Sequence, residues 1–173
     1  MKRLLVSAAV LGLLASAPAF AAGPTASVTT SADATVVAPI SITNAVNGTA
    51  TTLNFGQIAA NAAPGTVAIS STGVLSSPST PTLIVAGSTG SVPTFTVTGT
   101  ANLAYTGTVP ATATLVGPAG STNMTATLTK SGGAASLNAS GQDTFTLSAS
   151  LAVAANQTPG SYHGTFNVTA AYP

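Results

Sequence analysis

The chain has 173 residues, of which only 3 % are charged, and it contains no cysteine and no tryptophan. The lack of cysteine excludes a disulfide scaffold, a thiolate zinc site and a cysteine nucleophile. Three basic residues are too few for a phosphate-binding patch, which argues against nucleic acid as a partner. Disorder is disfavoured as well, because 45 % of the residues are hydrophobic.

Residues 1–21 have the pattern of a secretory signal peptide. A basic start and an apolar run over 4–15, too short to span a bilayer, precede a small-x-small cleavage site that ends at Ala21. We expect cleavage there, and an uncleaved membrane anchor is the alternative. The mature chain, 22–173, then has no transmembrane segment and only one lysine, two aspartates and one histidine. A secreted protein is predicted.

The mature chain alternates apolar and hydroxyl-bearing residues at a period of two, which is typical of strands with one buried face. Turn signals such as Ala63-Pro64-Gly65 separate the alternating runs, and no helix is expected beyond the signal. About eight to ten short strands predict an all-β fold, an antiparallel Ig-like β-sandwich, with a closed barrel as the alternative. Strands are expected at 36–42, 51–58, 66–70, 83–85, 94–100, 103–109, 122–129, 144–154 and 160–172.

This pattern also divides the chain and predicts its core. The signal peptide occupies 1–21, an N-terminal arm 22–33 and the β-sandwich domain 34–173. Shared parity within the strands predicts that one set of large side chains is buried in mutual contact. The set is Phe55, Phe95, Tyr105, Phe145, Leu147, Leu151, Phe166 and Val168.

Catalytic chemistry has almost no candidates. General acid–base catalysis needs titratable groups that converge on one pocket, and the mature chain offers only Asp33, Asp143, His163 and Lys130. His163 is predicted to face outward from a strand, because Tyr162, Gly164 and Phe166 share the other parity. The spacing of these residues does not suit a metal site, so no catalytic, metal-binding or cofactor-binding residue is assigned. Five N-x-S/T sequons occur, at Asn47, Asn123, Asn138, Asn156 and Asn167.

The C-terminus carries the most specific pattern. Gly160 is fourteenth from the end and Tyr172 is penultimate, and between them runs an alternating face of Tyr162, Gly164, Phe166, Val168 and Ala170. This segment resembles the C-terminal motif of pilus subunits assembled by the chaperone–usher route. The resemblance implies that a periplasmic chaperone binds this strand and that an outer-membrane usher is a further partner. An ordinary final strand of a sandwich is the alternative.

A second resemblance covers essentially the whole mature chain. The stretches ATVVAPISIT at 34–43, LNFGQIA at 53–59, FTVTGT at 95–100 and the G-x-Y-x-G-x-F-x-V run ending at Val168 are similar to a family of small secreted bacterial domains of unknown function. That family resembles pilin-like and spore-coat-U-like proteins. It implies a β-sandwich that passes through the periplasm to the cell surface or the exterior, as in a fimbrium that serves cell adhesion.

Three functions from different classes follow. The first is a non-enzymatic structural subunit of a fimbria-like or other cell-surface assembly, which polymerises with itself head to tail by β-strand addition. The near absence of charge favours it, because soluble β proteins normally guard their strand edges with charged side chains. The second is a secreted, adhesin-like binding module that works as a monomer. The third is a secreted hydrolase, which the scarcity of carboxylates argues against.

The N-terminal arm is the candidate donor strand for such polymerisation. Ala26, Val28, Thr30 and Ala32 alternate with polar neighbours, so the arm can add to a sheet edge of another copy and fill a groove with alternate side chains. This requires an open groove in the acceptor. A disordered tail is the alternative.

Overall fold

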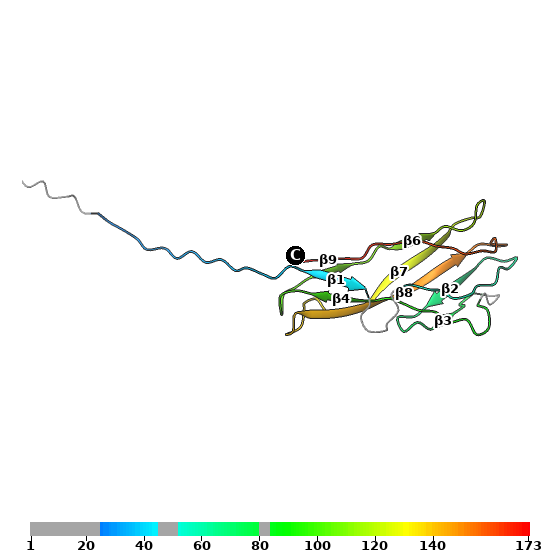
Figure 1. Cartoon of the computed structure of the whole chain (residues 1–173), viewed down its shortest axis with the longest axis horizontal. Coiled ribbons are helices and arrows are strands. Elements are labelled where there is room, and N and C mark those ends of the chain that lie inside the picture. Colours follow the sequence, from blue (N-terminus) through cyan, green and yellow to red (C-terminus); the bar gives the residue numbers. More distant parts are fainter. Residues whose placement is uncertain (1–24, 45–51, 80–83) are drawn as a thin grey trace, which may run out of the picture. The chain divides into compact units, whose positions relative to one another are not determined.

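The computed structural model describes residues 25–44, 52–79 and 84–173, and the predicted signal peptide lies outside these ranges (Figure 1). Within them the chain forms nine strands and no helix, and hence no helix that could cross a membrane. The strands are β1 (Ser41–Asn44), β2 (Gly65–Ile69), β3 (Leu75–Ser76), β4 (Thr94–Thr98), β5 (Thr106–Thr108), β6 (Thr112–Leu115), β7 (Met124–Gly132), β8 (Gln142–Val153) and β9 (Thr169–Ala171).

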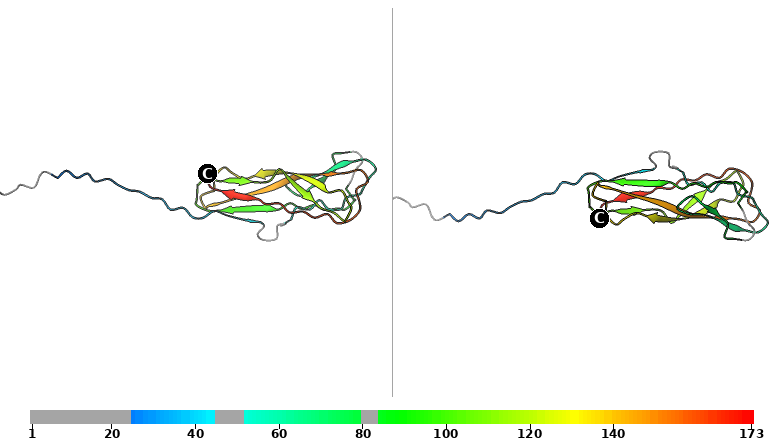
Figure 2. Two further views of the ribbon diagram at one scale, coloured as in Figure 1. Left: turned by 90° about the horizontal axis from the view of Figure 1, so that it is seen from above. Right: turned by 90° about the horizontal axis from the view of Figure 1, so that it is seen from below.

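The twelve-residue strand β8 organises the larger sheet. β7 pairs along one edge of β8, while β4 and β2 share the other edge, β4 beside residues 142–146 and β2 beside residues 149–153. β1 continues the sheet from β4, β3 from β2 and β6 from β7. β5 and β9 form a separate two-stranded sheet, and all of these pairings are antiparallel (Figures 1 and 2). The all-β fold predicted from the sequence is confirmed.

The alternation in β8 and β7 places their large residues on one buried face. Phe145, Leu147 and Leu151 are at most 2 % exposed, and the Thr and Ser residues between them face outward. The branched Cβ of threonine suits the pleated, half-exposed surface, which explains how a chain with so few charges still forms regular strands.

The core consists of two clusters of buried side chains. One surrounds Val67, Ala126 and Leu151, and the other surrounds Val97 and Phe145, whose ring stacks on Phe95 with the centroids 5.3 Å apart. Of the eight residues predicted to be buried together, six are buried, while Phe166 and Val168 are half-buried. The prediction of mutual contact is wrong. A twelve-residue strand is about 40 Å long, so residues near its two ends cannot touch the same neighbours.

Other strand predictions also need correction. Of the strand predicted over 51–58, the described residues 52–58 make only isolated bridges, and the strand predicted over 160–172 is reduced to a bridge at His163 and the short β9. The structure adds β3 and β6, which were not expected. A strand is defined by pairing with a neighbour, and the side-chain alternation of a single segment does not report whether that neighbour is present.

Contacts divide the chain into two units, between Thr35 and Val36. In the first unit, residues 25–35 form no strand and all of them are exposed. The second unit contains all nine strands and both core clusters. Its C-terminal segment, coloured red, lies beside β5 (Figure 2).

Candidate functional site

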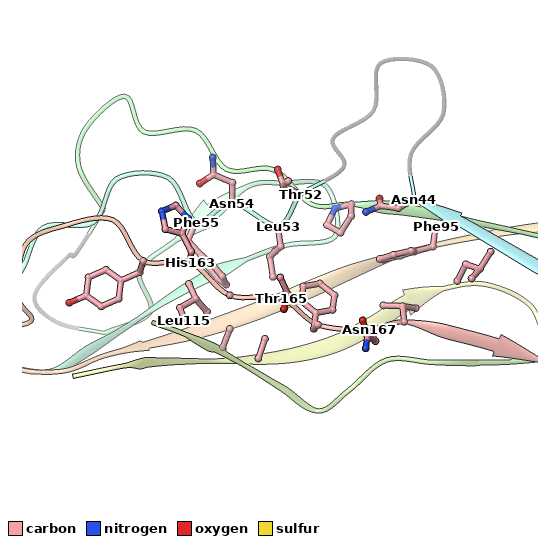
Figure 3. Close-up of a pocket in the computed structure, with 18 of the residues that line it drawn as sticks. Asn44, Thr52, Leu53, Asn54, Phe55, Phe95, Leu115, His163, Thr165 and Asn167 are labelled. Carbon is pink, nitrogen blue, oxygen red and sulfur yellow. The ribbon is translucent and has the colours of Figure 1, made fainter. Parts of the chain in front are cut away.

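A groove lies between two parts of the second unit that are far apart in sequence, residues 42–44 with 52–60 on one side and residues 157–168 on the other (Figure 3). It consists of two adjoining hollows of about 660 Å³ and about 580 Å³. The hollows are continuous because both are lined by Leu53, Asn54, Phe55, Leu115, Tyr162 and His163.

The floor of the groove is apolar. Leu115 of β6, Ala126 of β7 and Leu151 of β8 contribute to it, and each belongs to or packs against the first core cluster. An inserted apolar side chain would therefore be removed from water and packed against the existing core, which is favourable.

The first wall, formed by the segment that includes residues 52–58, presents an unpaired main-chain edge to the groove. The amide of Asn54 donates to the carbonyl of Ser91 (2.8 Å) and the amide of Ser91 donates back (3.0 Å). Because main-chain groups point alternately to the two edges of an extended chain, those of Leu53 and Phe55 face the opposite direction. In the part of the chain that the structure describes, these two residues make no main-chain hydrogen bond.

The second wall, residues 160–168, has the same property. The amide of His163 donates to the carbonyl of Val116 (2.9 Å) and the amide of Val116 donates to His163 (2.8 Å). Beyond this bridge, residues 164–168 make no hydrogen bond with any described residue. Extended main chain without a partner is an open template for a further strand. The groove is thus bordered on both sides by open strand edges.

The C-terminal face predicted from the sequence does point into the domain. Its large members, Tyr162, Phe166, Val168 and Tyr172, are half-buried and pack against the core clusters, as does Ala170. Its two glycines are required by close approaches. A Cβ at Gly160, where φ is +150°, would overlap the ring of Pro118, and one at Gly164 would overlap the carbonyl oxygen of Thr114.

Side-chain hydrogen bonds fasten the second wall near its two ends. Gln157, only 6 % exposed, donates its Nε2 to the hydroxyl of Tyr162 (2.7 Å). The hydroxyl of Tyr172 accepts from the amide of Thr100 (2.7 Å) and donates to the carbonyl of Ala38 (3.1 Å). The second wall is therefore fastened on both sides of residues 164–168, which themselves make no hydrogen bond with any described residue. The sequence pattern had indicated both tyrosines but not Gln157, because no alternation marks this single polar residue as buried.

The predicted donor residues of the arm, Ala26, Val28, Thr30 and Ala32, are all exposed and belong to no strand. Val28 is 89 % exposed and Val36 is 96 % exposed. The apolar parity of the arm continues through Val36, beyond the predicted arm boundary. An exposed, extended segment with one apolar face gains by adding to a sheet.

Three further titratable groups, Tyr105, Asp143 and Lys130, form a cluster away from the groove. Tyr105 donates its hydroxyl to Oδ2 of Asp143, which also accepts the amide of Ala134, both at 2.6 Å. The ammonium of Lys130 lies 4.7 Å from the ring centroid of Phe145 and 5.7 Å from that of Tyr105. None of these ionisable side chains lines the groove.

Burial alone would raise the pKa of Asp143. The hydrogen bonds from Tyr105 and from two main-chain amides, together with the charge of Lys130, outweigh burial and hold that pKa below its ordinary value. Burial, aided by the hydrogen bond to Asp143 and its charge, raises the pKa of Tyr105. The cluster is therefore a neutral phenol bound to a carboxylate, a stabilising contact at the edge of the second core cluster.

His163 is exposed, and its main chain contributes to the second wall. Across the described residues, no three side chains of His, Cys, Asp or Glu come close enough together to hold a metal ion.

A family model described as Domain of unknown function (DUF4402) matches residues 40–172. No curated protein and no solved structure matches the chain. The matched region spans β1 to β9 and both walls of the groove. The chain therefore belongs to the DUF4402 family of domains of unknown function.

Proposed function

We propose that this protein is a non-enzymatic structural subunit of a cell-surface assembly, in which the arm of one copy adds as a strand to the groove of the next. The observation that carries the proposal is the pair of unpaired main-chain edges above an apolar floor. An ordinary final strand would be paired along its length, whereas residues 164–168 are extended and unpaired.

The dimensions support the arm as occupant. Nine residues of the second wall, 160–168, extend over about 30 Å, and residues 25–36 of the arm extend over about 40 Å. Each main-chain hydrogen bond gained contributes about 0.5–1.5 kcal/mol net. Burial of Val28 adds about 1.5–3 kcal/mol. Several such contributions together can offset the entropy of ordering an extended arm.

Arm and groove are different surfaces of one chain, so their union is a head-to-tail contact. Such a contact generates an open filament unless the rotation between copies closes a ring. On this proposal the domain is an Ig-like sandwich completed by a strand from another copy. The proposed route is removal of the signal peptide, passage through the periplasm with a chaperone and an outer-membrane usher as partners, and incorporation at the cell surface into a fimbrium.

The test uses the mature chain and two adjacent arm substitutions. Val28→Asp places a charge on the face that enters the apolar groove, which carries a high desolvation cost. The matched control, Thr29→Asp, places the same charge on the opposite face, toward solvent. Deletion of residues 22–32 removes the donor altogether. Light scattering after size exclusion, with electron microscopy of the large species, reports the assembly of each variant.

We expect the wild type and Thr29→Asp to form filaments, and Val28→Asp and the deletion to stay monomeric. Addition of a peptide of residues 22–36 should cap the growing ends and shorten wild-type filaments. Filaments from the deletion variant would refute assembly through the arm. A wild type that stays monomeric at high concentration would refute polymerisation and favour a monomeric surface-binding module.

A further inference from the structure

We propose that Asp33 of one copy and His163 of the next form a cross-strand ion pair that fixes the register of the inserted arm. This inference rests on the proposed function and specifies which alignment of arm and groove is selected. Asp33 is the only charged residue of the arm. Among the residues that line the groove none is an Asp, Glu, Lys or Arg, and only His163 and Tyr162 can titrate.

The side-chain parities of the two segments allow this contact. In the arm the even-numbered residues are apolar apart from Thr30, so Asp33 lies on the polar face when the apolar face enters the groove. In the second wall Tyr162 and Phe166 pack inward, so His163 lies on the outer face, and it is exposed. His163 also lines the groove, where Figure 3 labels it. Both side chains therefore lie on the same outer side of the completed sheet.

The main-chain geometry brings them close. The amide and carbonyl of His163 are used by Val116, so they point away from the incoming strand. A residue opposite His163 is then in a non-hydrogen-bonded pair, in which the Cα atoms are about 4.5 Å apart and the side chains are nearest. We take the arm as antiparallel to this wall, as in the Val116–His163 bridge and in the sheet ladders of the structure.

With Asp33 opposite His163, three pairs of residues face inward. Val28 meets Val168, Thr30 meets Phe166 and Ala32 meets Gly164. A slip by one residue would turn the apolar face of the arm out of the groove and expose its side chains to water, which is unfavourable. A slip by two residues preserves that face, and small side chains tolerate it. The alternation alone therefore leaves several registers open, and the ion pair selects one of them.

A slip by two residues places Asp33 opposite a hydroxyl side chain, either Thr165 or Ser161. Neither carries a charge, so the aligned register gains an electrostatic contact that the slipped registers lack. The pair also makes assembly depend on pH, because histidine is the side chain that changes its charge between about pH 5 and 8. Among the described residues that line the groove, the only other titratable group is the phenol of Tyr162.

The sign follows from the charges. An ion pair between a carboxylate and an imidazole exists only while the imidazole is cationic, and imidazoles lose their positive charge as the pH rises, so a pair of this kind weakens with rising pH. An exposed pair of this kind changes an equilibrium constant by about two- to fivefold. We expect the association constant of the mature chain to be that much larger at pH 5.5 than at pH 8.0, as measured by sedimentation of the assembled fraction.

Substitutions separate the pair from general effects of pH. Asp33→Asn and His163→Gln should each abolish the ratio of the association constants at pH 5.5 and pH 8.0. The double variant should associate no more weakly than either single variant. Matched controls on the same faces two residues away, Ser31→Asn and Thr165→Asn, should keep the ratio. The pairing would be overturned if wild-type assembly did not depend on pH. It would also be overturned if the ratio of association constants at the two pH values survived in Asp33→Asn or His163→Gln.

Cysteine pairs read the register directly, since the chain has no native cysteine. Asp33→Cys with His163→Cys should form disulfide-linked oligomers on oxidation, while Asp33→Cys with Thr165→Cys should form few, because that diagonal is about 7–8 Å. Preferential linkage of the second pair would overturn the register. These failures are distinct from failure of the proposed function, which is a wild type that does not assemble or that assembles without its arm.

Discussion

Replacing Phe145 by alanine is the sharpest perturbation of the fold, because this side chain joins the long strand to its neighbours. Phe145 is 2 % exposed, stacks on Phe95 with centroids 5.3 Å apart and lies under the ammonium of Lys130 at 4.7 Å. Truncation of a buried phenylalanine costs about 3–5 kcal/mol from lost transfer energy and the cavity that remains. The stacking and cation–π contacts place the expected cost in the upper half of that range.

Urea unfolding of the wild type and Phe145→Ala measures this cost as a shift of the midpoint at unchanged slope. Phe166→Ala is the comparison, because this ring is half-buried and borders the groove, and its loss should cost only about 1–2 kcal/mol. Domains of this size are stable by about 5–15 kcal/mol, so both variants should remain measurable. A cost below about 1.5 kcal/mol for Phe145→Ala, or a larger cost for Phe166→Ala, would refute the burial described here.

Asp143→Asn should lower the unfolding free energy by less than about 1 kcal/mol, because solvent screens this carboxylate. Since folding lowers the pKa of Asp143, the stability advantage of the wild type is present above about pH 4 and is lost as the pH falls, and urea midpoints measured across pH 2–7 will show this. Gly164→Ala should displace the second wall, because its Cβ would overlap the carbonyl oxygen of Thr114, and a faster exchange of the Val116 amide would report this. Tyr172→Phe removes both hydroxyl contacts that fasten the end of that wall and should lower the unfolding free energy by about 1–3 kcal/mol, measured by urea unfolding.

Side-chain alternation predicted the parts of the fold whose faces differ strongly. In β8 the residues of one parity are large and apolar and those of the other are mostly hydroxyl-bearing, and the structure buries the first set. β7 behaves likewise, with Met124 and Leu128 buried between exposed threonines. β6 was missed because its alternation rests on Ala113 and Leu115, too weak a contrast to stand out between turn signals.

The site was only partly predictable, for a different reason. The C-terminal alternation correctly indicated that Tyr162 and Phe166 face inward. It also predicted a continuous strand, which the structure does not contain, because residues 164–168 lack a partner. The groove arises from the spacing between two segments about a hundred residues apart, and no local pattern encodes that spacing. The fastening of the second wall by Gln157 was missed because no alternation marks this single polar residue as buried.

Hydrogen exchange of the amides along the two walls tests strand addition most directly. In the monomeric mature chain the amides of Gly164, Phe166 and Val168 have no partner among the residues that the structure describes and should exchange rapidly, whereas that of His163 is already bonded. Strand addition should slow exchange at Gly164, Phe166 and Val168 in the assembled form and in the monomer mixed with a peptide of residues 22–36, and leave His163 almost unchanged. Equal exchange at all four amides before and after assembly would contradict insertion of a strand into this groove.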